Sequence, residues 1–289
     1  MNYFLHLLIL VGLYVILAQS LNLIMGYAGL LSLCHAAFFG LGAYVYVLLV
    51  VALHWPFVLA LPMSVLAVSL LALPVAFVCL RLRGDFFVLG TMGLQMIVYT
   101  VLYNWVDVTQ GPYGISGIPK PTILGWEARS IPAFCLLTGV LAGAVCLFCY
   151  RLSRIPFGRT LRAIRDDELA AMAIGKNAAW FKAVTFSIGG GIAAIAGALY
   201  AGYVSYVDPT AFTLEESIFL VAIVAVGGAG NLRGPVIGAI LLLMLPEALR
   251  FVQLPDSVAP NVRQLIYGVL LIALMRFRPQ GIGGQYAFD

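Results

Sequence analysis

Carboxylates inside apolar stretches are the residues best placed to do chemistry, because an acid in such surroundings usually marks a proton or ion pathway. Asp85 stands beside a basic pair, Glu215 and Glu216 stand at the start of an apolar stretch, and Glu247 follows a proline. None of the four falls clearly in the middle of a long apolar run. An ion-driven process therefore has little to work with in this sequence.

A histidine and a pair of cysteines are the other candidates for chemistry. His35 lies deep in an apolar run, where a lone histidine is more often a hydrogen-bonded packing residue than a ligand or a gate. Cys146 and Cys149 form a CxxC pair, but the sequence has no second CxxC or histidine pair to complete a zinc site. Buried cysteines usually act as small apolar residues. With no nucleophile–base pair and no phosphate-binding loop either, we expect no enzyme, no bound metal and no cofactor, and any energy comes from outside the chain.

The composition excludes a water-soluble domain as the setting for these residues. Of the 289 residues, 63% are hydrophobic and only 10% are charged, and the mean hydropathy is +1.03. A soluble domain carries charge on roughly a quarter of its residues, whereas residues 1–80 contain no Lys, Arg, Asp or Glu. The net charge of +4 is too small to indicate a nucleic-acid partner. We therefore expect an all-α polytopic membrane protein surrounded by the lipid bilayer.

Apolar runs account for most of the chain. A spanning helix needs about 20 apolar residues, and the runs that meet this requirement are 3–25, the stretch from the Gly26–Gly29 break to about 53, 57–80, 86–105, 131–150 and 183–207. Three later runs, at 217–232, 235–245 and 264–275, are short and interrupted by glycines and Pro246, which is typical of broken or re-entrant helices. We expect about 8–10 membrane segments in a single transmembrane domain, residues 1–289.

The distribution of basic residues orients these segments. If the third, fifth, seventh and ninth segments end in the cytoplasm, twelve of the 16 basic residues lie on that side and four on the other, and basic residues favour the cytoplasmic side. The charged loop at about 151–182 is then cytoplasmic, and the polar connection at about 106–130 is external. The cytoplasmic group is Arg81, Arg83, Arg151, Arg154, Arg159, Arg162, Arg165, Lys176, Lys182, Arg233, Arg276 and Arg278, and the external group is Lys120, Arg129, Arg250 and Arg263.

The charged loop has the pattern of an amphipathic helix that ends in a turn. Apolar residues can share one broad face, polar residues stay off it, and Gly175 can supply a left-handed C-terminal cap. Three successive acids would be repelled by an anionic lipid surface, so the mixed charge favours a protein partner over a helix lying on headgroups. The apolar face is Leu161, Ile164, Leu169 and Met172, and the polar residues are Arg162, Arg165, Asp166 and Glu168.

Small residues recur at helical spacing in the run 183–207. Such stripes let helix backbones approach closely in lipid, so we expect close helix packing here rather than a substrate path. One stripe is Gly189, Ala193, Gly197 and Ala201, and the other is Gly190, Ala194, Ala198 and Gly202.

Several stretches, in order along nearly the whole chain, resemble the branched-chain amino acid ABC permeases, in particular the M-type subunit of the Liv system. They are Leu21–Tyr44 (LNLIMGYAGLLSLCHAAFFGLGAY), Arg81–Gly84 (RLRG), Gly114–Pro119 (GISGIP), Gly158–Glu168 (GRTLRAIRDDE), Gly227–Pro235 (GGAGNLRGP) and Phe277–Gly281 (FRPQG). Two departures appear: Cys34 stands where the family usually has Gly, and Gln110–Tyr113 replaces a Gly-Gly-Ser/Thr stretch in the external connection.

The resemblance implies an importer in the cell inner membrane, with no enzymatic activity of its own. Its implied partners are a second (H-type) permease, against which the small-residue stripes can pack, two cytoplasmic ATPases and a periplasmic binding protein. It implies import of branched-chain or other hydrophobic amino acids by alternating access. A urea or short-amide ABC importer is the nearest alternative, and an ion-coupled secondary transporter is the next.

The resemblance also implies a role for the charged loop. Leu169–Gly175 is similar to the Glu-Ala-Ala-x-x-x-Gly coupling loop of ABC importer permeases, with Leu169 where Glu is expected. We expect this loop to dock in an ATPase groove through Leu161, Arg162, Ile164, Arg165, Glu168, Leu169, Met172 and Gly175. The polar and small residues at the helix breaks are candidates for the translocation path, and they are Asn22, Gly26, Gly29, Ser32, His35, Gly228 and Gly230.

Overall fold

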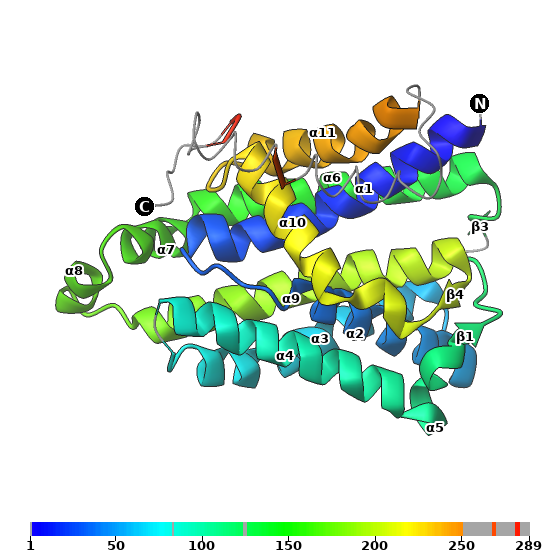
Figure 1. The fold of residues 1–289 in the computed structure, drawn as a ribbon, viewed down its shortest axis with the longest axis horizontal. Helices are drawn as coiled ribbons and strands as arrows, with labels where there is room; N and C mark the ends of the chain where they lie inside the picture. The colour runs from blue at the N-terminus through cyan, green and yellow to red at the C-terminus, as the bar shows by residue number, and fades with distance from the viewer. Residues whose placement is uncertain (1, 83, 124–125, 251–267, 270–280, 284–289) are drawn as a thin grey trace.

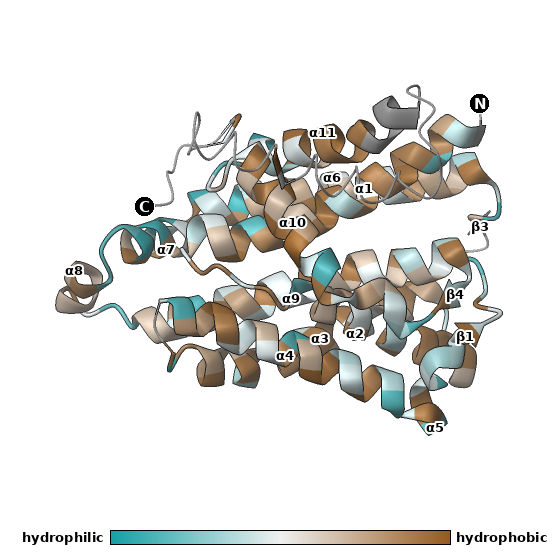
Figure 2. Cartoon of the chain, in the orientation of Figure 1, coloured by the Kyte–Doolittle hydropathy of each residue, from teal (hydrophilic) through white to brown (hydrophobic). Residues whose placement is uncertain are grey.

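The computed structural model describes residues 2–82, 84–123, 126–250, 268–269 and 281–283. Within them, six helices are long and apolar enough to cross a membrane, and they lie side by side in a bundle (Figure 1). Hydrophobic residues run along these helices, and many hydrophilic residues lie in the connections at the two ends (Figure 2). The all-α polytopic fold is confirmed. The six spans are built on α1 (Asn2–Asn22), α2 (His35–Val47), α3 (Phe57–Cys79), α4 (Asp85–Asn104), α6 (Ile131–Arg154) and α9 (Ala178–Val204).

Helix α9 lies at the centre of the bundle and is mostly buried, as are α1 and α2. In α3, α4 and α6 only 22–28% of the span is buried. The small residues of α9 allow this arrangement, because a Cβ added at Gly197 would lie 2.3 Å from the carbonyl oxygen of Phe39 on α2. Close packing of the stripes is confirmed, but they pack against helices of the same chain, so the expectation that they face a second permease is wrong.

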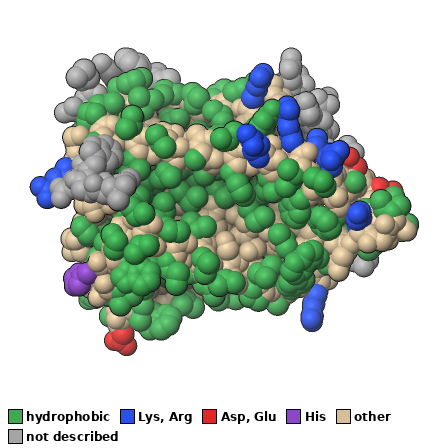
Figure 3. All heavy atoms as spheres, turned by 180° about the vertical axis from the view of Figure 1, so that it is seen from behind, with side chains coloured by type: hydrophobic (Ala, Val, Ile, Leu, Met, Phe, Trp, Pro, Cys, Tyr) green, Lys and Arg blue, Asp and Glu red, His purple; other side chains and the backbone are tan. Residues whose placement is uncertain are grey.

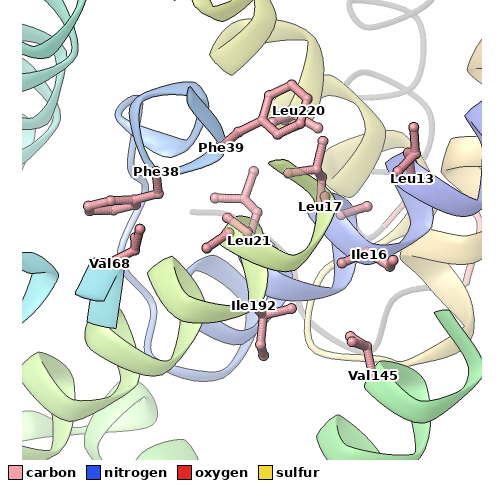
Figure 4. Close-up of a cluster of buried hydrophobic side chains, with 14 of the residues drawn as sticks. Leu13, Ile16, Leu17, Leu21, Phe38, Phe39, Val68, Val145, Ile192 and Leu220 are labelled. Carbon is pink, nitrogen blue, oxygen red and sulfur yellow. The ribbon is translucent and has the colours of Figure 1, made fainter. Parts of the chain in front are cut away.

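The core lies where these central helices meet. Figure 4 shows Leu13, Leu17 and Leu21 of α1 gathered with Phe38 and Phe39 of α2. Ile192 of α9 and Leu220 of α10 (Leu214–Gly227) complete the same cluster. The α1 members and Leu220 are at most 2% exposed. Apolar side chains therefore bind segments that lie far apart in the sequence.

Two membrane spans end in π-helices. Helix α1 continues as a π-helix, η1 (Leu23–Tyr27), and the chain then runs without helix until α2 begins at His35. A second π-helix, η2 (Leu48–Ala52), ends the span that α2 begins. The break expected after Met25 is therefore confirmed, and it includes a non-helical return to the start of α2.

The C-terminal segments agree only in part with those predicted from the sequence. Helix α10 has 14 residues, about 21 Å at 1.5 Å per residue, so it is short as expected. Helix α11 (Arg233–Arg250) continues through Pro246, so the expected stop at 245 is wrong. Proline removes one backbone donor and kinks a helix without always ending it. The predicted segment 264–275 lies outside the described residues except for 268–269.

One end of the bundle carries short elements that join the 106–130 connection to the segment after α9. Strand β1 pairs antiparallel with β4, with Ile115 opposite Val207, and β2 pairs antiparallel with β3, with Thr122 opposite Glu127. The elements here are α5 (Val106–Thr109), η3 (Gly111–Tyr113), β1 (Ile115–Ser116), β2 (Thr122–Ile123), β3 (Trp126–Glu127), β4 (Tyr206–Val207) and η4 (Pro209–Phe212).

The opposite end carries α7 (Pro156–Asp166) and α8 (Glu168–Ala173), which project beyond the bundle (Figure 1). Figure 3 shows most of the visible Lys and Arg side chains near this end. The two loops that the sequence assigns to opposite sides of the membrane thus lie at opposite ends of the molecule.

Candidate functional site

The first break, where η1 ends and the chain returns to α2, brings together three of the residues predicted to line the translocation path, namely Asn22, Gly26 and Gly230. Asn22 is 1% exposed, and its Oδ1 accepts a hydrogen bond from the Gly230 N–H at 2.9 Å while its Nδ2 donates to the Asn231 carbonyl at 3.0 Å. A Cβ at Gly26 would lie 2.3 Å from the Gly230 nitrogen. Gly228, with φ of 103°, lies in the same turn between α10 and α11. These residues form a close-packed, hydrogen-bonded junction between two helix breaks, and their role in translocation stays a prediction.

The N-terminus of α2 forms a second polar cluster. His35 is fully buried; its Nε2 contacts the Ser20 hydroxyl, and its ring meets Phe38 edge to face. Ser32 Oγ lies 3.2 Å from Cys34 Sγ. Side chains of other helices hold the first backbone N–H groups of α2, namely Ser217 Oγ at 2.9 Å from Ala36 N and Gln95 Oε1 at 2.7 Å from Ala37 N. His35 therefore belongs to a packed polar cluster, as the sequence favoured.

Sequence reasoning missed the partners in this cluster. Gln95 also donates to the Phe212 carbonyl at 2.7 Å, and Thr91 Oγ1 accepts from Leu33 N–H at 3.1 Å. Both side chains are fully buried on α4. An uncharged amide in an otherwise apolar span was the signal, because such a group needs a buried partner.

The charged loop contains two helices instead of one. Asp167 adopts an extended conformation between α7 and α8 and caps α8, its Oδ1 accepting from Ala170 N–H at 2.9 Å. At the other end, Gly175 has φ of 80° and donates to the Met172 carbonyl at 2.9 Å, and Lys176 donates to the Ala171 carbonyl at 3.1 Å. This is the Schellman pattern, and the left-handed conformation predicted for Gly175 is confirmed.

The division of the charged loop at Asp167 corrects the docking face expected from the sequence. Leu161 and Ile164 are each 1% exposed; Leu161 belongs to the main core, and Ile164 packs with Ala171 and Ala178. A face shared by all four apolar residues requires one continuous helix, and Asp167 ends the first one. Leu169 and Met172 do face outward, and they are joined by Ile174, which is 73% exposed. We call these three exposed residues of the second helix and its cap, Leu169, Met172 and Ile174, the α8 tip.

The polar residues of the loop anchor it to the bundle. Arg162 Nη2 donates to the Ser153 carbonyl of α6 at 3.0 Å, and Glu168 forms an ion pair of 2.7 Å with Lys182 of α9. Arg165 reaches the first break, where its Nη1 donates to the Gly26 carbonyl at 2.7 Å. A Cβ at Gly29 would lie 2.8 Å from Arg165 Cγ, so the path candidate Gly29 packs against the charged loop.

A cavity of about 1150 Å³ lies beside the loop. The chain returning from the first break lines one side, and α8 with the start of α9 lines another. Its polar lining includes Asp85, Glu168, Lys176 and Lys182. The cavity thus separates α8 from the chain that leads from η1 to α2.

At the opposite end, Lys120 joins the 106–130 connection to α9. Its Nζ donates to the carbonyls of Gly202 and Tyr203 at 3.2 and 2.7 Å, where a cation is favoured at a helix C-terminus. Burial lowers the pKa of this amine. The connection is therefore tied to the central helix.

Comparison with known proteins identifies the family of this chain. The family model described as "Branched-chain amino acid transport system / permease component" matches residues 3–275. The high-affinity branched-chain amino acid transport system permease protein LivM of Salmonella typhimurium is 34% identical over 93% of this chain and 67% of its own length, and LivM of Escherichia coli matches equally. The autoinducer 2 import system permease protein LsrC of Salmonella paratyphi B is 27% identical over 75% of this chain and 62% of its own.

No solved structure matches the chain. The family match nevertheless covers nearly its whole length, and the membrane spans, the helix breaks and the projecting loop agree with the expected permease architecture. This multi-pass membrane protein belongs to the family of permease components of branched-chain amino acid transport systems.

Proposed function

We propose that this chain is one permease subunit of an ATP-binding-cassette importer that moves branched-chain or other hydrophobic amino acids across the cytoplasmic (inner) membrane. It works by alternating access with a second, H-type permease, two cytoplasmic ATPases and a periplasmic binding protein. The family match and the printed function of the LivM relatives support the transport class. The sequence has no GxxxxGK[ST] phosphate loop, which supports hydrolysis of ATP by the partner subunits.

The α8 tip is the observation that carries this proposal. Three large apolar residues on a small helix project from the end of the bundle at which basic residues gather. Hydrogen-bonded caps stabilise both ends of this helix. Such a capped, apolar protrusion suits a helix-in-groove contact with an ATPase.

Leucine uptake by the reconstituted transporter tests the proposal. Proteoliposomes with both permeases, both ATPases and the binding protein should accumulate leucine, isoleucine and valine when ATP is supplied on the ATPase side. Collapse of ion gradients by an uncoupler should leave this uptake intact, because no coupling ion is needed. Uptake that requires an ion gradient would support a secondary transporter, and competition by urea or acetamide but not by leucine would support the short-amide alternative.

A further inference from the structure

The π-helix η1 ends at a place where backbone carbonyls lose their helical partners. The last carbonyls of any helix lack intrahelical donors and need partners from elsewhere. At Gly26 the replacement comes from the charged loop, because Arg165 Nη1 donates to this carbonyl at 2.7 Å. A cation at a helix C-terminus is also favoured by the helix dipole. Arg165 on α7 thus caps the interrupted first span.

The Arg165 side chain is held in this position from two directions. Only 11% of the side chain is exposed, and its stem covers Gly29, which has φ of 69° and no Cβ to obstruct it. Asp166 holds the outer side of the guanidinium, its Oδ1 accepting from Nε at 3.0 Å and from Nη2 at 2.8 Å. Arg165 therefore points into the membrane domain and away from the surface that a docked ATPase would contact.

The Gly26 peptide is also part of the junction with the turn between α10 and α11. It packs directly against Gly230, and Asn22 bonds both Gly230 and Asn231. A displacement of α7 that moved Arg165 would therefore act on the η1 end and, through it, on the turn between α10 and α11. A cavity lies beside this contact, lined by Gly29 and Leu30 on one side and by α8 residues on another.

We propose that Arg165 is the positioning residue through which the charged loop moves the helix breaks, so that ATPase closure felt at the α8 tip reaches the membrane domain by way of the Gly26 carbonyl. This inference rests on the proposed function. It assigns transmission to Arg165 on α7 and docking to the α8 tip, which belong to separate helices joined at Asp167.

The ratio of leucine transported to ATP hydrolysed tests this separation in the complete reconstituted transporter. Arg165→Met should assemble and hydrolyse ATP near the wild-type rate, because the α8 tip is intact. Its transport per ATP should fall about tenfold or more, as expected for the loss of a charge-assisted hydrogen bond to a buried carbonyl. Arg159→Met is the matched control, since Arg159 is exposed on the same helix, and it should keep the wild-type ratio.

A second readout does not depend on the substrate. On a chain freed of its native cysteines, Leu31→Cys places a thiol on the cavity wall next to the break. Its labelling rate with a soluble thiol reagent should differ between the ATP-free and vanadate-trapped complex, and Arg165→Met should abolish that difference. If the wild-type complex carries no leucine, the proposed function fails, while the labelling result still decides the role of Arg165.

Gly29→Ala keeps the arginine but places a methyl group where its stem lies. It should lower the ratio in the same direction, and it decides the question if Arg165→Met does not assemble. An unchanged ratio with an unchanged labelling response in Arg165→Met, or in Gly29→Ala where Arg165→Met cannot be prepared, would overturn the inference. Equal loss in Arg159→Met would overturn it too, since net charge would then explain the effect.

Discussion

Single polar side chains bond the backbone groups that are left unpaired at helix ends of this protein. Inside a bilayer no water is available to backbone groups that a helix leaves unpaired, so each break needs its own side-chain partner. Asn22 serves the first break, and Gln95 and Ser217 serve the start of α2. Arg165 and Lys120 serve helix ends at the two faces of the bundle, where a charge can stay near water. The breaks are therefore specifically stabilised features of the native state.

Removal of the Gln95 amide should destabilise the protein measurably. Gln95→Leu takes away the donor to the Phe212 carbonyl and the acceptor of the shorter Ala37 N–H bond, leaving the longer one to the Cys34 carbonyl. The expected cost is about 1–3 kcal/mol for a polar group left unpaired in the interior. Thermal unfolding in detergent should show a lower midpoint. Thr100→Val, an exposed position on the same helix, is the control and should unfold like the wild type. Equal midpoints for all three proteins would contradict the assigned role of Gln95.

Gly175 offers a test of backbone conformation alone. No atom lies within 4 Å of a Cβ built there, so Gly175→Val adds no clash with a neighbour, only the cost of a left-handed β-branched residue, about 1–2 kcal/mol. We expect the chain to insert normally while substrate-stimulated ATP hydrolysis and uptake by the complete transporter fall. Gly175→Asn should retain most activity, because Asn tolerates this conformation. Wild-type rates in Gly175→Val would show that the cap of α8 is not needed.

At the scale of elements, α7 and α8 divide the charged loop into an anchor and a protrusion. Helix α7 buries Leu161 and Ile164 and is bonded to α6 and to the first break. Helix α8 exposes its tip and is tied back to α9 by the ion pair of Glu168 with Lys182. An exposed ion pair contributes little energy, so α8 is held mainly by its link to α7 at Asp167 and by the packing of Ile164 with Ala171.

Substitutions on the two helices should have different effects. Leu169→Ser and Ile174→Ser remove exposed apolar surface from the α8 tip, so we expect unchanged thermal stability and weaker co-purification with the ATPases. Ile164→Ser buries a hydroxyl and leaves a cavity, which should lower the unfolding midpoint by a few degrees, at about 2 kcal/mol. Co-purification and midpoint measured on the same preparations separate the two roles. Loss of ATPase binding in Ile164→Ser at full stability would restore the broad face expected from sequence.

The sequence predicted the spans well, because the requirement for about 20 apolar residues acts locally along the chain. α3 and α4 were predicted to within two residues at each end, and the left-handed Gly175 followed from its place after the apolar repeat. The division at Asp167 was missed, since an amphipathic pattern can continue across a one-residue break. The passage of α11 through Pro246 was missed because proline was read as a stop.

The contents of the site were predictable only in part, because they depend on contacts between distant segments. Asn22, Gly26 and Gly230 were singled out separately, and the structure brings them together. The small-residue stripes of α9 predicted close packing, but they did not predict the partners, which are other helices of the same chain. Gln95 and Arg165 act on residues 58 and 139 positions away. No local pattern contains such pairings.

The whole molecule is polarised along the helix direction. One end carries the α8 tip and most of the basic side chains seen in Figure 3, and the other carries the paired strands and the N-terminus (Figure 1). This geometry fits a chain with its charged loop in the cytoplasm and its 106–130 connection outside. Such an orientation would present the tip to cytoplasmic ATPases and the strand end to a periplasmic binding protein.

Single cysteines on an otherwise thiol-free chain test this orientation. Tyr113→Cys at the strand end and Lys176→Cys beside the α8 tip both replace exposed residues. In intact spheroplasts a membrane-impermeant maleimide should label the first, and it should reach the second only after permeabilisation. Leu70→Cys, on the exposed apolar face of α3, should resist the reagent in both conditions, since a thiol in the bilayer stays protonated and out of reach. Labelling of both loop positions from one side would contradict their placement at opposite faces. The reverse order would put the basic end outside the cell, against the charge rule, and would remove the α8 tip from any cytoplasmic ATPase.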